Sequence, residues 1–314
     1  PVIIHNVYHC MKDCCSLSEH HRLGLIRDRK IPLERIEQDY FTCPTNWRQK
    51  DTIIAGIKEK YPAYTDEILM NIPGFFYDKK RGKLSFTGHK GLGILIRNSD
   101  SRIVAIQIRK DTIQEGDSRY IWFSSSFATY NPDEYNGGNG CGSPKDVCYP
   151  QMLKKHTLCI TEGRFKSEKL TESGNISISV QGVTSWHGIE ETIKHMNGIH
   201  NVFIFFDADI LGKHVLFMQS EKMIRKIQDE FPGLYIRYAF WSKKNGKGID
   251  DCIIAGNISK VKYYEAKRAA EICNDAYTHA LGEYHVANLR ELKQERAKEF
   301  EDYLQILTES MLGL

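Results

Sequence analysis

Val202-Phe203-Ile204-Phe205-Phe206-Asp207-Ala208-Asp209 is the stretch that decides the fold of this 314-residue chain. Five consecutive apolar residues indicate a strand buried on both faces, as in the parallel sheets of α/β proteins. The strand runs directly into two acids that are one residue apart. Because side chains alternate along an extended chain, Asp207 and Asp209 can point to the same side.

Three further apolar runs flank this stretch and predict more strands. They span residues 157–161, 176–180 and 235–240, and the clearest helical stretch lies at 213–229. Strands that alternate with helices favour an α/β fold with a mostly parallel, doubly wound sheet. Such sheets bind their ligands beyond the carboxyl ends of the strands.

Acidic residues follow two of the other predicted strands as well. Glu162 lies at the end of Leu158-Cys159-Ile160-Thr161, and Asp250 and Asp251 follow the strand at 235–240 within Lys247-Gly248-Ile249-Asp250-Asp251. An isolated acid after a strand is usually a helix cap. Three acidic segments in one order instead predict a platform for Mg²⁺ or Mn²⁺, since Mg²⁺ prefers oxygen ligands and bridges carboxylates to phosphates.

The rest of the chain suggests four regions. Residues 1–90 read as mainly helical, and 91–150 contain a hairpin (93–97 and 102–109), a third strand (120–123) and a polar loop (131–150). Residues 151–256 form the predicted catalytic domain, and 257–314 are helical by composition, a packing or partner segment.

Composition excludes several classes of protein. Forty-three Lys and Arg against 40 Asp and Glu give a net charge of +3, so any nucleic-acid surface must be local. No apolar run approaches the roughly 20 residues that span a bilayer. Nine cysteines without paired spacing indicate a reducing cytoplasm, and they disfavour a zinc site near His9 and Cys10.

Thr161-Glu162-Gly163 and Asp207-Ala208-Asp209, 45 residues apart, resemble the two motifs of the Toprim domain. That domain is shared by bacterial-type DNA primases, type IA and II topoisomerases and certain nucleases. The resemblance implies a Rossmann-like sheet, and it implies divalent metal and catalysis at Glu162, Asp207 and Asp209. Asp250 and Asp251 are similar to a later acidic motif of primases, which implies a secondary metal role.

The stretch before this domain is similar to the basic subdomain of bacterial primases, a smaller mixed α+β unit. The match implies that Arg109 and Arg119 contact phosphate. Lys166 and Lys247, in the predicted catalytic domain, are further candidates for binding nucleotide or nucleic acid. Tyr120 and Trp122 either stack on a base or fill the core. Expected partners are a single-stranded DNA template, nucleotides and, as a further option, a replicative helicase.

Two features depart from the primase pattern. Lys166 stands where primases have an acid four positions after the motif Glu, so either one metal contact is missing or Lys166 binds phosphate. The zinc ribbon that precedes a primase core is also absent. A Toprim nuclease and a non-catalytic DNA-binding or helicase-recruiting module therefore remain alternatives to a primase of a phage, plasmid or integrative element. A topoisomerase is disfavoured because no large cleavage domain fits in the chain.

Overall fold

A computed structural model describes residues 2–314, and the chain divides into two compact units. The first unit extends to Pro144 and the second runs from Lys145 to Leu314. The two units are described separately below. None of the helices in the described part of the chain is both long and apolar enough to cross a bilayer.

The first unit contains two antiparallel sheets and a set of short helices. One sheet has the strand order β1-β4-β5-β6 and the other has the order β3-β2-β7. The strands are β1 (Tyr40–Thr42), β2 (Phe75–Asp78), β3 (Lys83–Phe86), β4 (Gly91–Arg97), β5 (Ile103–Lys110), β6 (Tyr120–Trp122) and β7 (Tyr135–Gly137). The helices are α1 (Val2–Asp13), α2 (Glu19–Leu23), a π-helical turn (Gly24–Asp28), α3 (Leu33–Asp39), α4 (Trp47–Lys60), α5 (Asp66–Met70) and a 3-10 turn (Ser126–Tyr130).

The predicted hairpin is confirmed in this unit. Strands β4 and β5 pair antiparallel from Gly91 opposite Lys110 to Arg97 opposite Ile103, and β6 joins the far edge of β5. Apolar side chains from α1, α4 and the sheets form one core, in which Val7, Phe75 and Ile106 are fully buried.

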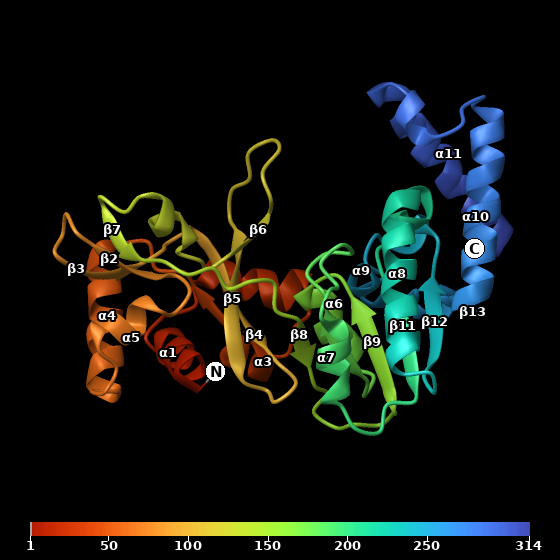
Figure 1. Ribbon diagram of the computed structural model, residues 1–314. Helices are drawn as coiled ribbons and strands as arrows, with labels where there is room; N and C mark the ends of the chain where they lie inside the picture. Colours follow the sequence, from red (N-terminus) through yellow and green to blue (C-terminus); the bar gives the residue numbers. More distant parts are fainter. Residues whose placement is uncertain (1) are drawn as a thin grey trace. The chain divides into compact units, whose positions relative to one another are not determined.

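The second unit is built on a six-stranded sheet of order β13-β12-β11-β9-β10-β8 (Figure 1). The strands are β8 (Asp146–Cys148), β9 (Thr157–Thr161), β10 (Ile176–Ser179), β11 (Asn201–Phe205), β12 (Tyr235–Phe240) and β13 (Lys262–Glu265). The four central strands run parallel, and the edge strands β8 and β13 are antiparallel to their neighbours. The predicted mixed α/β architecture with a largely parallel sheet is confirmed.

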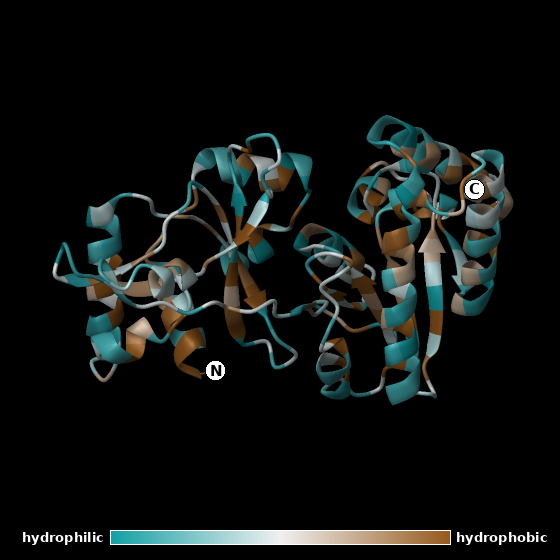
Figure 2. Cartoon of the chain, turned by 45° about the horizontal axis from the view of Figure 1, so that its top comes forward, coloured by the Kyte–Doolittle hydropathy of each residue, from teal (hydrophilic) through white to brown (hydrophobic). Residues whose placement is uncertain are grey.

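Helices cover both faces of this sheet. They are α6 (Arg164–Thr171), α7 (Ile189–Lys194), α8 (His214–Glu230), α9 (Ile249–Ile254), α10 (Ala266–Glu283) and α11 (Gln294–Leu312), with 3-10 turns at Ala208–Gly212, Lys243–Asn245, Ile258–Lys260 and Leu289–Glu291. Alternate strand residues such as Val202 and Ile204 pack with α7, α8 and α10. Phe205 packs instead with α6 and α9 on the other face. Figure 2 shows that the helices of this unit carry both hydrophilic and hydrophobic residues.

Two sequence expectations are wrong in detail. The polar stretch 131–150 contains the strands β7 and β8, and the helical tail includes the edge strand β13. These strands have only three or four residues, too few for a periodic signal. They form because neighbouring strands offer a free edge for pairing, which is tertiary context that local composition does not carry.

Candidate active site

Strands β9 and β11 are neighbours whose carboxyl ends meet at one edge of the sheet. Thr161 pairs with Phe205 in the parallel register, and its hydroxyl donates to the Phe205 carbonyl oxygen at 2.8 Å. Glu162 and Asp207 emerge just beyond this pair. The Asp207 backbone N–H donates to the Glu162 Oε1 at 3.0 Å. The first and second acidic segments are therefore joined directly.

Lys166 extends from the first turn of α6 into the same cluster. Its ammonium forms an ion pair with Asp207 Oδ1 and lies 4.0 Å from Glu162 Oε2. Burial opposes the charge of Lys166, but Glu162 and Asp207 outweigh it and raise the pKa of this lysine. Burial raises the pKa of Glu162, and the charge of Asp207 adds to the rise while Lys166 opposes it.

Asp209 lies in the 3-10 turn after β11 and has lysine partners of its own. Lys213 Nζ is 2.8 Å from Asp209 Oδ2, and Lys247 Nζ is 3.8 Å from the same atom and 3.9 Å from Asp207 Oδ2. Burial works against ionisation of Asp209, yet the hydrogen bond and charge of Lys213 lower its pKa overall. Asp209 therefore stays a carboxylate.

The third acidic segment borders the same edge. The backbone N–H of Ala208 donates to the Lys247 carbonyl oxygen at 2.9 Å, which holds the segment beside Asp207. Asp251 Oδ2 accepts from the Gly248 N–H at 3.2 Å and so caps α9. Asp250 is 3% exposed and contributes to the charge around Lys166.

Residue 248 must be glycine because Asp250 and Lys166 pack closely against its backbone. A Cβ at this position would overlap the Asp250 carboxylate and would lie 2.9 Å from Lys166 Cε. The absence of a side chain at Gly248 thus lets the lysine lie against the acidic segment.

The carboxylates fit a divalent cation under one condition. Among residues 2–314, no three acidic, His or Cys side chains converge closely enough to hold a metal ion as they stand. Mg²⁺, however, is commonly bound by one or two carboxylates and several waters rather than by a protein cage. Glu162 and Asp209 lie near enough for the charge of Asp209 to raise the pKa of Glu162, and they could hold such an ion when Lys213 and Lys247 turn to solvent.

Two residues at this edge were missed by sequence reasoning. Lys213 pairs with Asp209, and its spacing of four residues was a usable signal. Gln305 of α11 donates from Nε2 to the Ala208 carbonyl oxygen at 3.0 Å and accepts from the Gly212 N–H at 2.8 Å. These two bonds hold the turn that carries Asp209. No local pattern marks Gln305, because the contact spans nearly 100 residues of chain.

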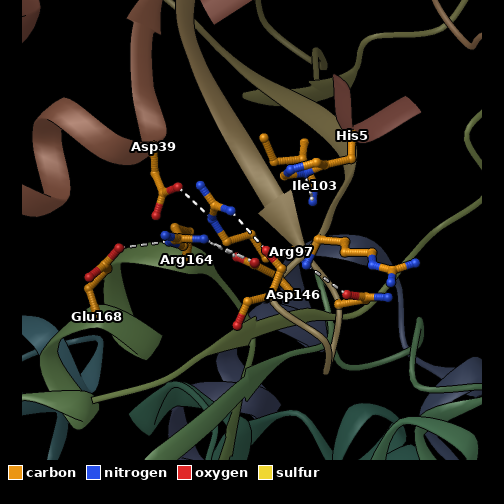
Figure 3. A network of polar contacts seen from close by, with 10 residues as sticks. His5, Asp39, Arg97, Ile103, Asp146, Arg164 and Glu168 are labelled. Carbon is orange, nitrogen blue, oxygen red and sulfur yellow. Dashed lines mark hydrogen bonds and ion pairs between the residues drawn. The ribbon is translucent and has the colours of Figure 1, made fainter. Parts of the chain in front are cut away.

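A buried ionic network fixes the start of α6 (Figure 3). Arg164 Nε donates to Glu168 Oε1 at 2.8 Å, and Arg164 Nη1 donates to Asp146 Oδ1 at 3.0 Å. All three side chains are almost fully buried. Because α6 also carries Lys166, this network positions the lysine that contacts Asp207.

The predicted phosphate-binding residues of the first unit lie on and beside β5. Arg109 is half-buried, and its buried Nε has no hydrogen-bond partner within the described chain. Arg119 is exposed, and its carbonyl oxygen accepts from the Lys110 N–H at 2.9 Å. Nearby, burial lowers the pKa of His89, and the charges of Lys110 and Lys50 lower it further.

Tyr120 and Trp122 on β6 are neither fully exposed nor fully buried, and a further aromatic side chain, Trp186, lies in the second unit. Trp186 packs at the margin of the core of the second unit and stacks on His187 at a ring distance of 4.3 Å.

The family model that matches this chain describes a domain without an assigned function. A family described as "Domain of unknown function (DUF3854)" matches residues 149–259, which contain the four central strands of the six-stranded sheet and the acidic cluster. No curated protein matches the sequence.

Comparison with solved structures shows that the fold is that of DNA primase catalytic domains. The RNA polymerase domain of Mycobacterium tuberculosis primase DnaG, in complex with a double-stranded DNA oligomer, matches with a TM-score of 0.57 over 98% of both chains. The Aquifex aeolicus primase (zinc-binding and RNA polymerase domains) matches with a TM-score of 0.53 over 98% of this chain and 74% of its own. A DnaG primase catalytic domain bound to single-stranded DNA gives 0.52 over 100% and 96%. Identity is 12% in each case.

Proposed function

We propose that this chain is a Toprim-type, Mg²⁺- or Mn²⁺-dependent nucleotidyltransferase that synthesises primers on single-stranded DNA, in the cytoplasm, for a phage or other mobile element. The observation that carries the proposal is the meeting of Glu162 and Asp207 at the carboxyl edge of a parallel sheet. The likeness to primase catalytic domains, some of them bound to DNA, supports it.

The acidic residues would bind the metal ion, and the basic residues would bind phosphate. A divalent cation held by Glu162 and Asp209 would neutralise charge that develops on the transferred phosphoryl group. Lys247, whose side chain is 62% exposed, lies where it can contact nucleotide phosphate. Arg109 and Arg119 would contact the phosphates of template or nucleotide, and the unpartnered Nε of Arg109 supports that role.

The proposal is tested by primer synthesis on single-stranded DNA with nucleoside triphosphates and Mn²⁺ or Mg²⁺. Asp207→Asn combined with Asp209→Asn should abolish incorporation. Asp229→Asn, an exposed carboxylate on α8, is the matched control and should leave it unchanged. Full activity of the double variant would refute the assignment.

One observation favours a second candidate, a DNA-binding module without catalysis. Lysines already engage both aspartates of the cluster, Lys166 at Asp207 and Lys213 at Asp209. DNA binding without incorporation or cleavage, by a wild-type protein supplied with metal, would support this function. Cleavage without nucleoside triphosphates would instead support a nuclease.

A further inference from the structure

Lys166 differs from the other lysines of the acidic cluster in how firmly it is held. Its side chain is 17% exposed, whereas those of Lys213 and Lys247 are 38% and 62% exposed. Lys213 and Lys247 can therefore turn to solvent when a ligand arrives. Lys166 lies against Gly248 and contacts Asp207, so its ammonium has little freedom to leave.

The difference in mobility between Lys166 and the other two lysines matters because of the formal charge of the acidic cluster. The carboxylates of Glu162, Asp207 and Asp209, with the buried Asp250 close to Lys166, are offset by the three ammonium groups of Lys166, Lys213 and Lys247. A divalent ion that enters must displace positive charge or be repelled by it. Displacing Lys213 and Lys247 frees Asp209, but it does not free Asp207.

We infer that the Lys166 ammonium is a built-in cation that permanently occupies the position beside Asp207. The centre then takes up a single divalent ion, through Glu162 and Asp209, and takes it up weakly. This inference rests on the proposed function, because it assumes that the acidic cluster is a metal centre. It assigns Lys166 a role that neither a metal ligand nor a phosphate-binding lysine would have.

A titration of the full chain with Mn²⁺ tests the role of Lys166 as a built-in cation without any activity assay. Binding is measured as the loss of the electron paramagnetic resonance signal of free Mn²⁺. Wild type should bind one ion. Lys166→Met should bind two, the first at least about tenfold more tightly, since an ammonium a few ångströms from a divalent ion repels it strongly. Lys166→Arg keeps the positive charge and should bind like wild type.

A charge-balanced double variant gives a second, independent measurement. Asp207→Asn with Lys166→Met removes both members of the ion pair, so the formal charge of the cluster equals that of wild type. Its affinity for Mn²⁺ should match wild type within about threefold, because Asp207 is not a ligand in this scheme. This comparison remains decisive if Lys166→Met alone does not fold.

Several results would overturn the inference. They are two ions bound by wild type, equal affinity and stoichiometry in wild type and Lys166→Met, or loss of Mn²⁺ binding in the double variant. Failure of the proposed function has a different signature: the Mn²⁺ pattern would hold while no primers are made. Absence of Mn²⁺ binding from all of these proteins would overturn both.

Discussion

The backbone N–H of Asp207 donates to the side chain of Glu162 at 3.0 Å, so one carboxylate of the cluster orients the chain segment that carries the next. This bond spans the ends of β9 and β11, and it ties the geometry of the cluster to the sheet. Glu162 therefore has a structural role beside its proposed chemical one, and the two roles can be separated by mutation.

Glu162→Gln should separate them, because the amide oxygen of Gln can still accept the Asp207 N–H while the negative charge is lost. We expect primer synthesis to fall by at least about a hundredfold, with an unfolding free energy within about 0.5 kcal/mol of wild type. Glu162→Ala leaves the Asp207 N–H unpaired, so besides losing activity it should lower the unfolding free energy by about 1–3 kcal/mol. Urea denaturation checks the stability, and equal stability of the two variants would contradict the structural role.

Gly248→Ala should disturb the site through packing alone. The new Cβ would overlap the Asp250 carboxylate and press on Lys166. We expect a loss of about 1–3 kcal/mol in unfolding free energy. Gly233→Ala is the matched control, since a Cβ there meets nothing within 4 Å. Thermal unfolding of the two variants measures the difference, and an unchanged Gly248→Ala protein would show that the segment is loosely packed.

Arg164→Met should be the most damaging of these substitutions. It removes the guanidinium that donates to the buried carboxylates of Asp146 and Glu168. Breaking a buried ionic network in this way typically costs about 3–5 kcal/mol. Arg268, whose side chain is 64% exposed, forms an ion pair with Glu271. Arg268→Met should therefore change the unfolding free energy by less than about 1 kcal/mol. Denaturation midpoints of the two variants provide the test.

The stability of the chain should fall below neutral pH in part through His214. Burial lowers the pKa of His214 to about 4, and its ring stacks on Tyr277 at 3.6 Å. The unfolded chain takes up this proton near pH 6.5 and the folded chain only near 4, so stability is full above 6.5 and is lost as the pH falls between these values. After discounting for partial exposure, the loss is about 1–2 kcal/mol.

His214→Phe keeps a ring for stacking but cannot be protonated. The difference in unfolding free energy between pH 7 and pH 4.5 should therefore be smaller in this variant than in wild type. Chemical denaturation at both pH values measures it. An identical pH dependence in the two proteins would show that His214 does not contribute.

Arg109→Gln should weaken the binding of single-stranded DNA by removing one phosphate contact. The slope of log K against log salt concentration should decrease in magnitude by about 0.7, the value for one phosphate on a single strand. Arg102→Gln, on the exposed turn of the hairpin, should leave the slope unchanged. Fluorescence anisotropy over a range of salt concentrations compares them, and equal slopes for both variants would remove Arg109 from the interface.

The sequence predicted the strands that are continuous apolar runs and the helix that has a periodic apolar face. The strands at 157–161, 202–206 and 235–240 and the helix at 213–229 correspond to β9, β11, β12 and α8. The edge strands β8 and β13 were not predicted, because their formation depends on the exposed edges of β10 and β12.

The candidate site was predictable to a similar extent. That Glu162 lies beside Asp207 follows from parallel strands ending in acids. The sequence did not predict that Lys166 pairs with Asp207. It left open whether Lys166 replaces a metal-binding acid or binds phosphate. The ion pair with Asp207 depends on the close approach of Gly248, which only the folded chain reveals.

Anomalous scattering from a crystal soaked in Mn²⁺ tests the central claim most directly. The account predicts an anomalous peak at the carboxyl edge of β9 and β11, within coordination distance of Glu162 and Asp209. Manganese bound elsewhere on the protein, with no peak at this edge, would contradict it.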